Sequence, residues 1–166
     1  MTAPVNVFFA AFLAIAVFIA GCAAPAKTDL ANQPEASPWH GRLAVRIDSE
    51  PPQSFAAGFE LTGSPLTGEL TLLTPLGSTA AVLSWTAQTV VMRANGEVRY
   101  FESLDELIRQ TVGTAIPVTA LFEWLNGNNT QVSDWNADLS QYAQGRITAR
   151  RMPPAPAAEL RLVLEK

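Results

Sequence analysis

The stretch ELTLLTPLGSTAAVLSW, residues 69–85, decides the fold expected of this 166-residue chain. It contains two short runs rich in apolar residues, 69–72 and 80–85, and turn-forming Pro75 and Gly77 lie between them. A connection this short leaves no room for a crossover helix, so the two runs pair in antiparallel fashion. The stretch therefore predicts an antiparallel hairpin.

Similar runs recur on both sides of this hairpin, with the spacing of an antiparallel meander. Asn95-Gly96 marks a second tight hairpin. The predicted strands cover residues 42–47, 55–61, 69–72, 80–85, 89–93, 97–101, 145–151 and 159–164.

Two helices interrupt the strand pattern late in the chain. Ser103 and Glu106 fit a capping box, which predicts a helix over residues 104–112 that ends at Gly113. Pro117 suits a first helical position, which predicts a second helix over residues 117–126. The expected fold is mainly β (α+β), one curved antiparallel sheet with two short helices.

Several predicted strands carry apolar residues at both parities, which indicates that both faces of the sheet are shielded from water. The helices can cover one face tightly, as a sealed core, or loosely, around an apolar cavity, and the sequence leaves both open. Seven apolar residues of the strand and helix patterns are the candidates for lining such a cavity: Val45, Phe59, Leu72, Leu83, Leu107, Leu121 and Trp124.

The N-terminal segment has the pattern of a bacterial lipoprotein signal peptide. An uncharged apolar run, residues 7–20, is too short to cross a bilayer and leads into IAGC, residues 19–22. We expect a signal peptide over 1–21, a diacylglyceryl and an N-acyl chain on Cys22, and a flexible tether over 22–38. A cysteine buried at the end of an ordinary helix is the alternative.

Lipidation predicts that residues 39–166 form one domain held at a membrane. By resemblance to bacterial lipoproteins, an aspartate directly after the cysteine would favour retention in the inner membrane. This chain has Ala23 at that position. We therefore expect the periplasmic face of the outer membrane. Leu76 lies between the turn formers Pro75 and Gly77, which places it at the tip of the turn. There it could touch a bilayer or an acyl chain.

Composition argues against several functions. The net charge of -4 comes without a basic cluster, which argues against a nucleic-acid partner. His40 is the single histidine and Cys22 the single cysteine, so neither a metal site nor a His-dependent nucleophile has support. We expect a monomer that is not an enzyme and has no cofactor besides its covalent lipid.

Four motifs together resemble the LolB family of outer-membrane lipoprotein receptors: ELTLLTPLGST (69–79), ANG (94–96), GTAIPV (113–118) and LFEWLNG (121–127). The resemblance covers most of residues 39–166. It implies an incomplete antiparallel β-barrel closed by helices around an apolar cavity. It also implies that lipoproteins arrive from the soluble periplasmic carrier LolA, and that Leu76 helps deliver them into the outer membrane.

Two rival hypotheses remain open at this point. The protein could bind another hydrophobic ligand in the same cavity, or it could be a structural lipoprotein with a sealed core and no cargo.

Overall fold

The structure is a computed structural model that describes residues 39–132 and 134–165. The predicted signal peptide, the tether and Cys22 lie outside the described residues. Residues 35–166 form a compact unit, and every described helix and strand belongs to it.

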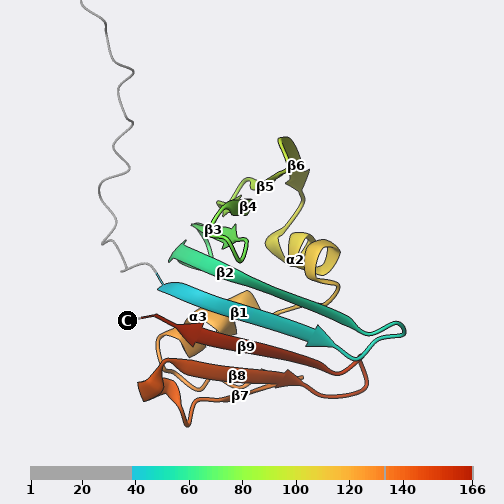
Figure 1. The fold of residues 1–166 in the computed structure, drawn as a ribbon. Helices are drawn as coiled ribbons and strands as arrows, with labels where there is room; N and C mark the ends of the chain where they lie inside the picture. The colour runs from blue at the N-terminus through green and yellow to red at the C-terminus, as the bar shows by residue number, and fades with distance from the viewer. Residues whose placement is uncertain (1–38, 133, 166) are drawn as a thin grey trace, which may run out of the picture. The chain divides into compact units, whose positions relative to one another are not determined.

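The described residues form nine strands in one sheet (Figure 1), and each neighbouring pair is antiparallel. The order across the sheet is β6-β5-β4-β3-β2-β1-β9-β8-β7. The strands are β1 (Trp39–Ile47), β2 (Gln53–Gly63), β3 (Gly68–Leu73), β4 (Thr79–Trp85), β5 (Val90–Ala94), β6 (Glu97–Phe101), β7 (Trp135–Asp138), β8 (Arg146–Arg151) and β9 (Ala158–Leu164).

This architecture confirms the expected fold, an incomplete antiparallel barrel with two short helices. The hairpin at Asn95 and Gly96 is present, with φ of 53° and 79° at these residues, as a tight hairpin turn requires. Strand β7 is an addition to the predicted strands. Its four residues WNAD alternate, with Trp135 and Ala137 buried, but a run this short is a weak signal by itself.

The first and last strands join the two ends of the described chain. β1 pairs with β2 along one edge and with β9 along the other, with Val45 opposite both Phe55 and Leu160. The six-strand meander β1–β6 and the three-strand meander β7–β9 therefore become one continuous sheet. The sequence left the pairing of the last strands open, since this contact joins residues more than one hundred positions apart.

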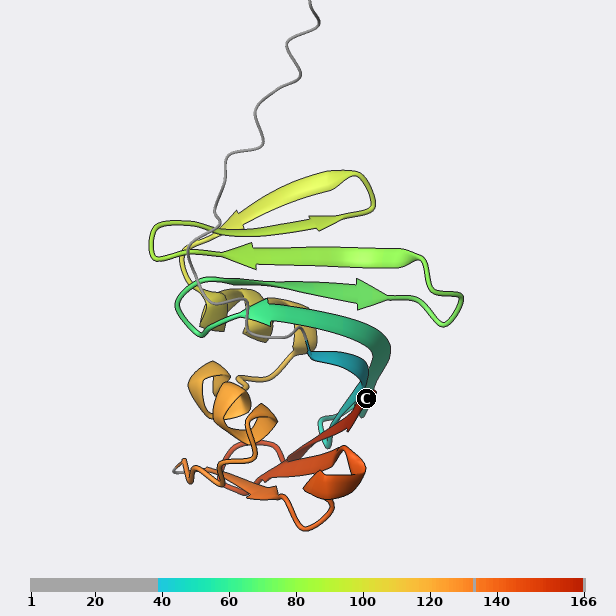
Figure 2. The same cartoon turned by 90° about the vertical axis from the view of Figure 1, so that its left-hand side faces the viewer.

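The two helices connect the two free edges of the sheet. The chain leaves the edge strand β6, forms α2 (Leu104–Val112) and α3 (Val118–Leu125), and continues into the opposite edge strand β7. In Figure 2 the helices accordingly lie inside the curve of the sheet. Their place in the sequence makes them the closure of the barrel.

Local capping sets the ends of α2, whereas the N-terminus of α3 has no side-chain cap. Ser103 Oγ accepts a hydrogen bond from the Glu106 N–H at 3.1 Å, and Gly113 ends α2 in the left-handed conformation, as the capping box and the glycine predicted. α3 begins one residue later than expected, because Pro117 takes the N-cap position.

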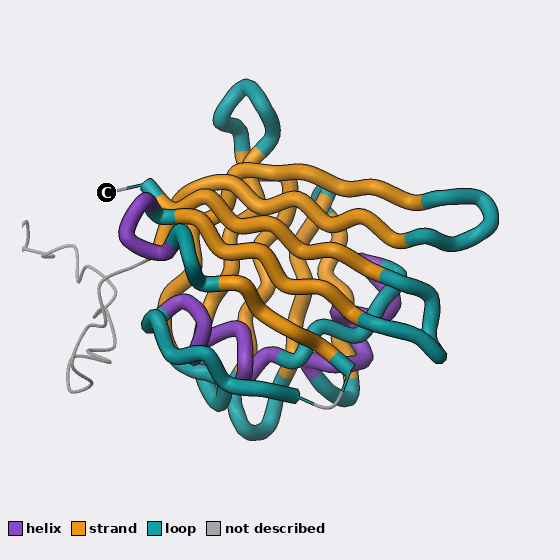
Figure 3. The backbone as a smooth tube through the Cα atoms, turned by 90° about the horizontal axis from the view of Figure 1, so that it is seen from below, coloured by secondary structure: helices purple, strands orange, loops and turns teal. Residues whose placement is uncertain are grey.

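The strands alternate between an inner face, toward the helices, and an outer face. Along β1, Val45 and Ile47 are buried on the inner face, whereas the side chains of Arg42 and Arg46 are exposed on the outer face. Figure 3 shows the helices on one side of the sheet and a projecting loop on the other. Among the described residues, no helix has the length and apolar character that crossing a bilayer requires.

On the outer face, one carboxylate links two neighbouring strands. Glu159 on β9 accepts from Arg150 on β8 at 2.7 Å and from Arg161 at 2.6 Å. Partial burial raises the pKa of Glu159, but the hydrogen bonds from the two guanidinium groups lower it by more, so the pKa lies below its ordinary value.

This shift predicts a pH-dependent contribution to stability. A carboxyl whose pKa is lower in the folded state stabilises the fold above its unfolded pKa of about 4.3, and the contribution is lost as the pH falls through the folded value. We expect Glu159→Gln to lower the free energy of unfolding at pH 7 by about 1 kcal/mol or less, because the arginines are exposed. At pH 2 it should change nothing.

Thermal unfolding at both pH values measures the effect, and Glu97→Gln on an exposed position of β6 is the control. An equal loss of stability at pH 2 and pH 7 would contradict the assignment.

Candidate functional site

Between the inner face of the sheet and the helices lies an apolar cavity of about 70 Å³. Its lining residues are apolar throughout and come from five strands and both helices. They are Leu43, Phe59, Leu61, Leu70, Leu83, Trp85, Leu104, Ile108, Val118, Leu121, Phe122, Leu125 and Leu162.

The volume of this cavity decides between the two arrangements that the sequence left open. About 70 Å³ is the share of liquid volume of roughly two water molecules. Small-ligand sites are commonly about 300–1,000 Å³. In this structure the helices thus pack closely on the inner face of the sheet and leave only a small apolar space.

The seven cavity candidates all belong to the inner core, but they take different places in it. Phe59, Leu83 and Leu121 line the cavity. Val45, Leu72, Leu107 and Trp124 are buried in the surrounding core and do not line it.

Strand parity offers a signal for some lining residues outside that candidate set. Leu61 is two residues from Phe59, and Leu70 is two from Leu72, so each shares the inner face of its strand with a candidate. The lining positions on α2 depend on how that helix is rotated against the sheet, which the sequence does not specify.

Aromatic contacts hold α3 over this space. The ring of Phe122 meets Trp39 and Trp85 in edge-to-face geometry, at centroid distances of 5.5 and 6.4 Å. Trp124 is fully buried, and its indole N–H donates to the Thr130 carbonyl at 2.9 Å. These contacts attach the helix both to the sheet and to the segment that follows it.

The turn between β3 and β4 is the second notable feature. Leu76 at its tip is 94% exposed, whereas Leu73 at the end of β3 is half-buried. Hydrogen bonds to Thr74 organise the turn: its carbonyl accepts from the Gly77 N–H at 2.9 Å, and its hydroxyl accepts from the Ser78 N–H at 3.2 Å.

Gly77 permits this shape of the turn. Its φ of 81° suits glycine, and an added Cβ would meet no atom within 4 Å, so backbone conformation and not crowding favours glycine here. An internally bonded turn thus presents one large aliphatic side chain to solvent, as the sequence predicted.

Among the described residues, no group of three histidine, cysteine, aspartate or glutamate side chains gathers as a metal site would require. His40 is exposed at the start of β1, on the outer face of the sheet. The arrangement of the described residues offers apolar contact surfaces.

Comparison with known proteins agrees with the geometry. The family model described as "Outer membrane lipoprotein LolB" matches residues 38–152, which is more than half of the chain. The chain belongs to the LolB family. The match includes the cavity-lining helices and the β3–β4 turn, so the LolB resemblance read from the motifs is confirmed.

Individual relatives carry the same description. An outer-membrane lipoprotein LolB of Bordetella pertussis is 30% identical over 94% of this chain and 90% of its own length. One of Shewanella loihica is 33% identical over 77% of this chain, and one of Chromobacterium violaceum is 28% identical over 69%. The match spans 60% of the length of the Shewanella loihica protein and 65% of the Chromobacterium violaceum protein.

The packing of α2 gives a direct test of the site's construction. Leu107 is fully buried, so Leu107→Ala should lower the free energy of unfolding by about 2–5 kcal/mol through lost burial and a new void. Leu66→Ala, at a position 76% exposed, should change it by about 0.5 kcal/mol or less. Urea unfolding measures both, and a loss below about 1 kcal/mol for Leu107→Ala would contradict the packing.

Proposed function

We propose that this protein is a lipid-anchored receptor that accepts lipoproteins from a soluble LolA-type carrier and inserts them into the outer membrane. In this proposal Cys22 carries the lipid, the domain faces the periplasm, and the protein acts as a monomer without catalysis. The observation that carries the proposal is the entirely apolar lining of the inner cavity in a LolB-family fold.

Acyl chains require such a space because water disfavours them strongly. Each buried methylene is worth about 0.8 kcal/mol, so a chain of about 14 methylenes exposed to water costs on the order of 10 kcal/mol. A receptor for lipoproteins must therefore cover the chains during transfer. The inner face, with its apolar lining from seven elements, is suited to do so.

The small volume of the cavity implies that loading separates the helices from the sheet. An acyl chain needs several times the room of the two water molecules that about 70 Å³ corresponds to. The apolar contacts that α2 and α3 make with the sheet would be replaced by contacts with the cargo. Because both states bury apolar surface, the free-energy difference between them can be small enough for release.

Release can then follow differences in affinity. A drop of about 1.4 kcal/mol at each step favours the next site tenfold, from carrier to receptor and from receptor to bilayer. Leu76 supports the last step, because an exposed aliphatic side chain on a projecting turn can enter the apolar region of a membrane at little cost.

The role of the inner cavity predicts a selective loss of cargo uptake. Leu121 is half-buried and lines the cavity, so Leu121→Asp places a charge where the acyl chains would lie. We expect acceptance of lipoprotein from a loaded carrier to fall at least tenfold. Thr119→Asp, exposed on the same helix, is the matched control and should retain acceptance.

Acceptance is measured by incubating residues 35–166 with the loaded carrier and separating the two proteins. Circular dichroism checks that both variants fold. Equal acceptance by the two variants would count against the cavity, and failure of the unaltered protein to acquire cargo would favour one of the two rival functions.

The role of Leu76 predicts a loss of insertion into the membrane without a loss of cargo uptake. Leu76→Glu should leave stability and cargo uptake unchanged, because the side chain is 94% exposed, yet block insertion into liposomes, because a carboxylate resists entry into hydrocarbon. Leu66→Glu, at an exposed leucine in the turn before β3, is the matched control. Normal insertion by Leu76→Glu would refute the role.

A further inference from the structure

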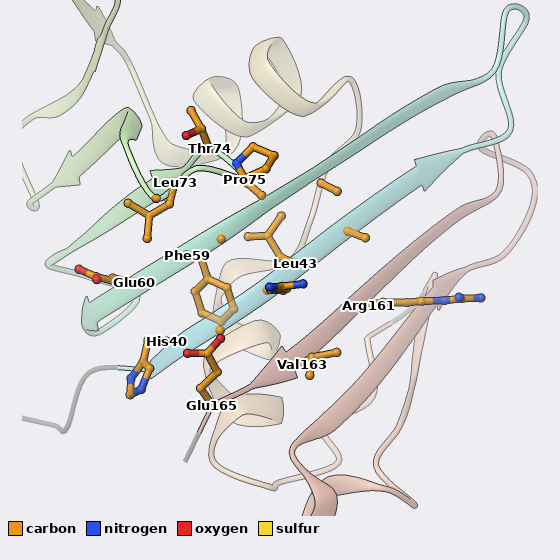
Figure 4. A pocket seen from close by; sticks show the side chains of 17 residues that line it. His40, Leu43, Phe59, Glu60, Leu73, Thr74, Pro75, Arg161, Val163 and Glu165 are labelled. Atoms are coloured by element: carbon orange, nitrogen blue, oxygen red, sulfur yellow. The ribbon is translucent and has the colours of Figure 1, made fainter.

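A second hollow lies on the outer face of the sheet, away from the helices. It is an open groove of about 780 Å³ that crosses β2, β1 and β9 below the β3–β4 turn. Figure 4 shows Leu73, Thr74 and Pro75 at one side of this groove and Val163 across the strands from them. We call it the outer groove.

Small residues make the floor of the outer groove. Ala44 on β1 pairs with Ala56 on β2, and the next outward-facing position of β2 is Gly58. A Cβ added at Gly58 would lie 3.2 Å from the Leu73 Cβ, so the glycine lets β3 and its turn approach closely. Larger side chains at these positions would fill the groove.

One part of the groove wall is apolar and lies against the turn that presents Leu76. Leu73 and Pro75 contribute from the β3–β4 side, and Val163, 46% exposed, contributes from β9. An apolar segment of a ligand could lie between them. Any membrane that Leu76 touches is therefore close to this wall.

Charged residues of both signs border the same groove. Arg42 lies at its centre and Arg161 toward one end, while Glu60 and Glu165 lie toward the other end, on either side of His40. Arg42 is two residues from His40 along β1, a distance of about 7 Å, and Arg161 lies opposite Ala44, two residues further.

These charged side chains differ in whether they already have a partner in the structure. Arg161 forms an ion pair with Glu159, which also pairs with Arg150. The side chains of Arg42, Glu60 and Glu165 make no hydrogen bond or ion pair with any residue that the structure describes. Within residues 39–132 and 134–165, one cation and two anions are therefore left without a charged partner.

We propose that the outer groove binds one zwitterionic glycerophospholipid of the membrane that Leu76 contacts. Arg42, with Arg161 beside it, binds the lipid phosphate, and Glu60 and Glu165 attract the amine of the headgroup. Part of an acyl chain packs on Leu73, Pro75 and Val163. This inference rests on the proposed membrane contact of Leu76.

Size and charge favour this occupant. A volume of about 780 Å³ falls within the range of roughly 300–1,000 Å³ that is typical of small-ligand sites. An anionic lipid such as phosphatidylglycerol would satisfy the arginines but leave two carboxylates facing its headgroup without a cation. A zwitterionic headgroup offers an anion to the arginines and a cation to the carboxylates.

Photocross-linking on the lipid-anchored full chain tests the proposal. The protein is reconstituted into vesicles of equal parts phosphatidylethanolamine and phosphatidylglycerol that contain traces of a phosphatidylethanolamine with a diazirine on one acyl chain. We expect cross-links to map to Leu73, Pro75 and Val163. The same probe with a phosphatidylglycerol headgroup should label about two- to fivefold less, the effect of one exposed charge pair.

Two pairs of variants separate the groove from general membrane contact. Ala56→Leu fills the floor and should reduce labelling to background, whereas Ser54→Leu, on the same face of β2 outside the groove, should not. Arg42→Gln should lower labelling severalfold, whereas Arg46→Gln, on the same face of β1 outside the groove, should leave it unchanged.

Undiminished labelling of Ala56→Leu, cross-links confined to the inner cavity, or stronger labelling by the phosphatidylglycerol probe would each overturn the proposal. Cargo transfer is measured on the same vesicles. Transfer without groove labelling overturns this inference alone. A lack of transfer by the unaltered protein counts against the proposed function, and groove labelling can still be read because the anchor holds the protein on the membrane.

Discussion

The backbone pairing of β1 with both β2 and β9 is the interaction on which the rest of the structure depends. It joins a six-strand meander to a three-strand meander from the other end of the chain and makes one curved sheet of them. Because the two free edges, β6 and β7, are consecutive strands, the segment between them must cross the sheet. That segment forms α2 and α3, so the closure of the barrel follows from strand order.

The curved sheet separates two kinds of apolar surface. Its inner face meets the helices around a small cavity without polar lining, and its outer face carries the exposed turn of Leu76 and the outer groove. In strands, this separation follows from alternation, since neighbouring residues point to opposite faces. A receptor that first holds acyl chains and then meets a bilayer can use one face for each task.

The small volume of the inner cavity suits the proposed role of a transient receptor. A large preformed cavity would leave apolar walls exposed to water before loading, at about 25 cal/mol per Å². Here side chains of the helices cover the apolar inner face. Phe122 contacts Trp39 and Trp85, and Leu107 is buried. In the proposed function, cargo would replace these internal contacts, so the net free energy of loading would be smaller than the burial of its acyl chains alone would give. Weak net binding would allow onward transfer.

The sequence by itself determined the local features: the β3–β4 hairpin with Leu76 at its tip, the Asn95-Gly96 turn, and the ends of α2 at Ser103 and Gly113. Each depends on residues a few positions apart, whose conformational preferences act without the rest of the fold. Only the tertiary structure decided the pairing of β1 with β9, the short strand β7, the lining of the cavity by Phe59 but not Leu72, and the outer groove. Those features depend on register and helix rotation between distant segments, which one-dimensional patterns do not encode.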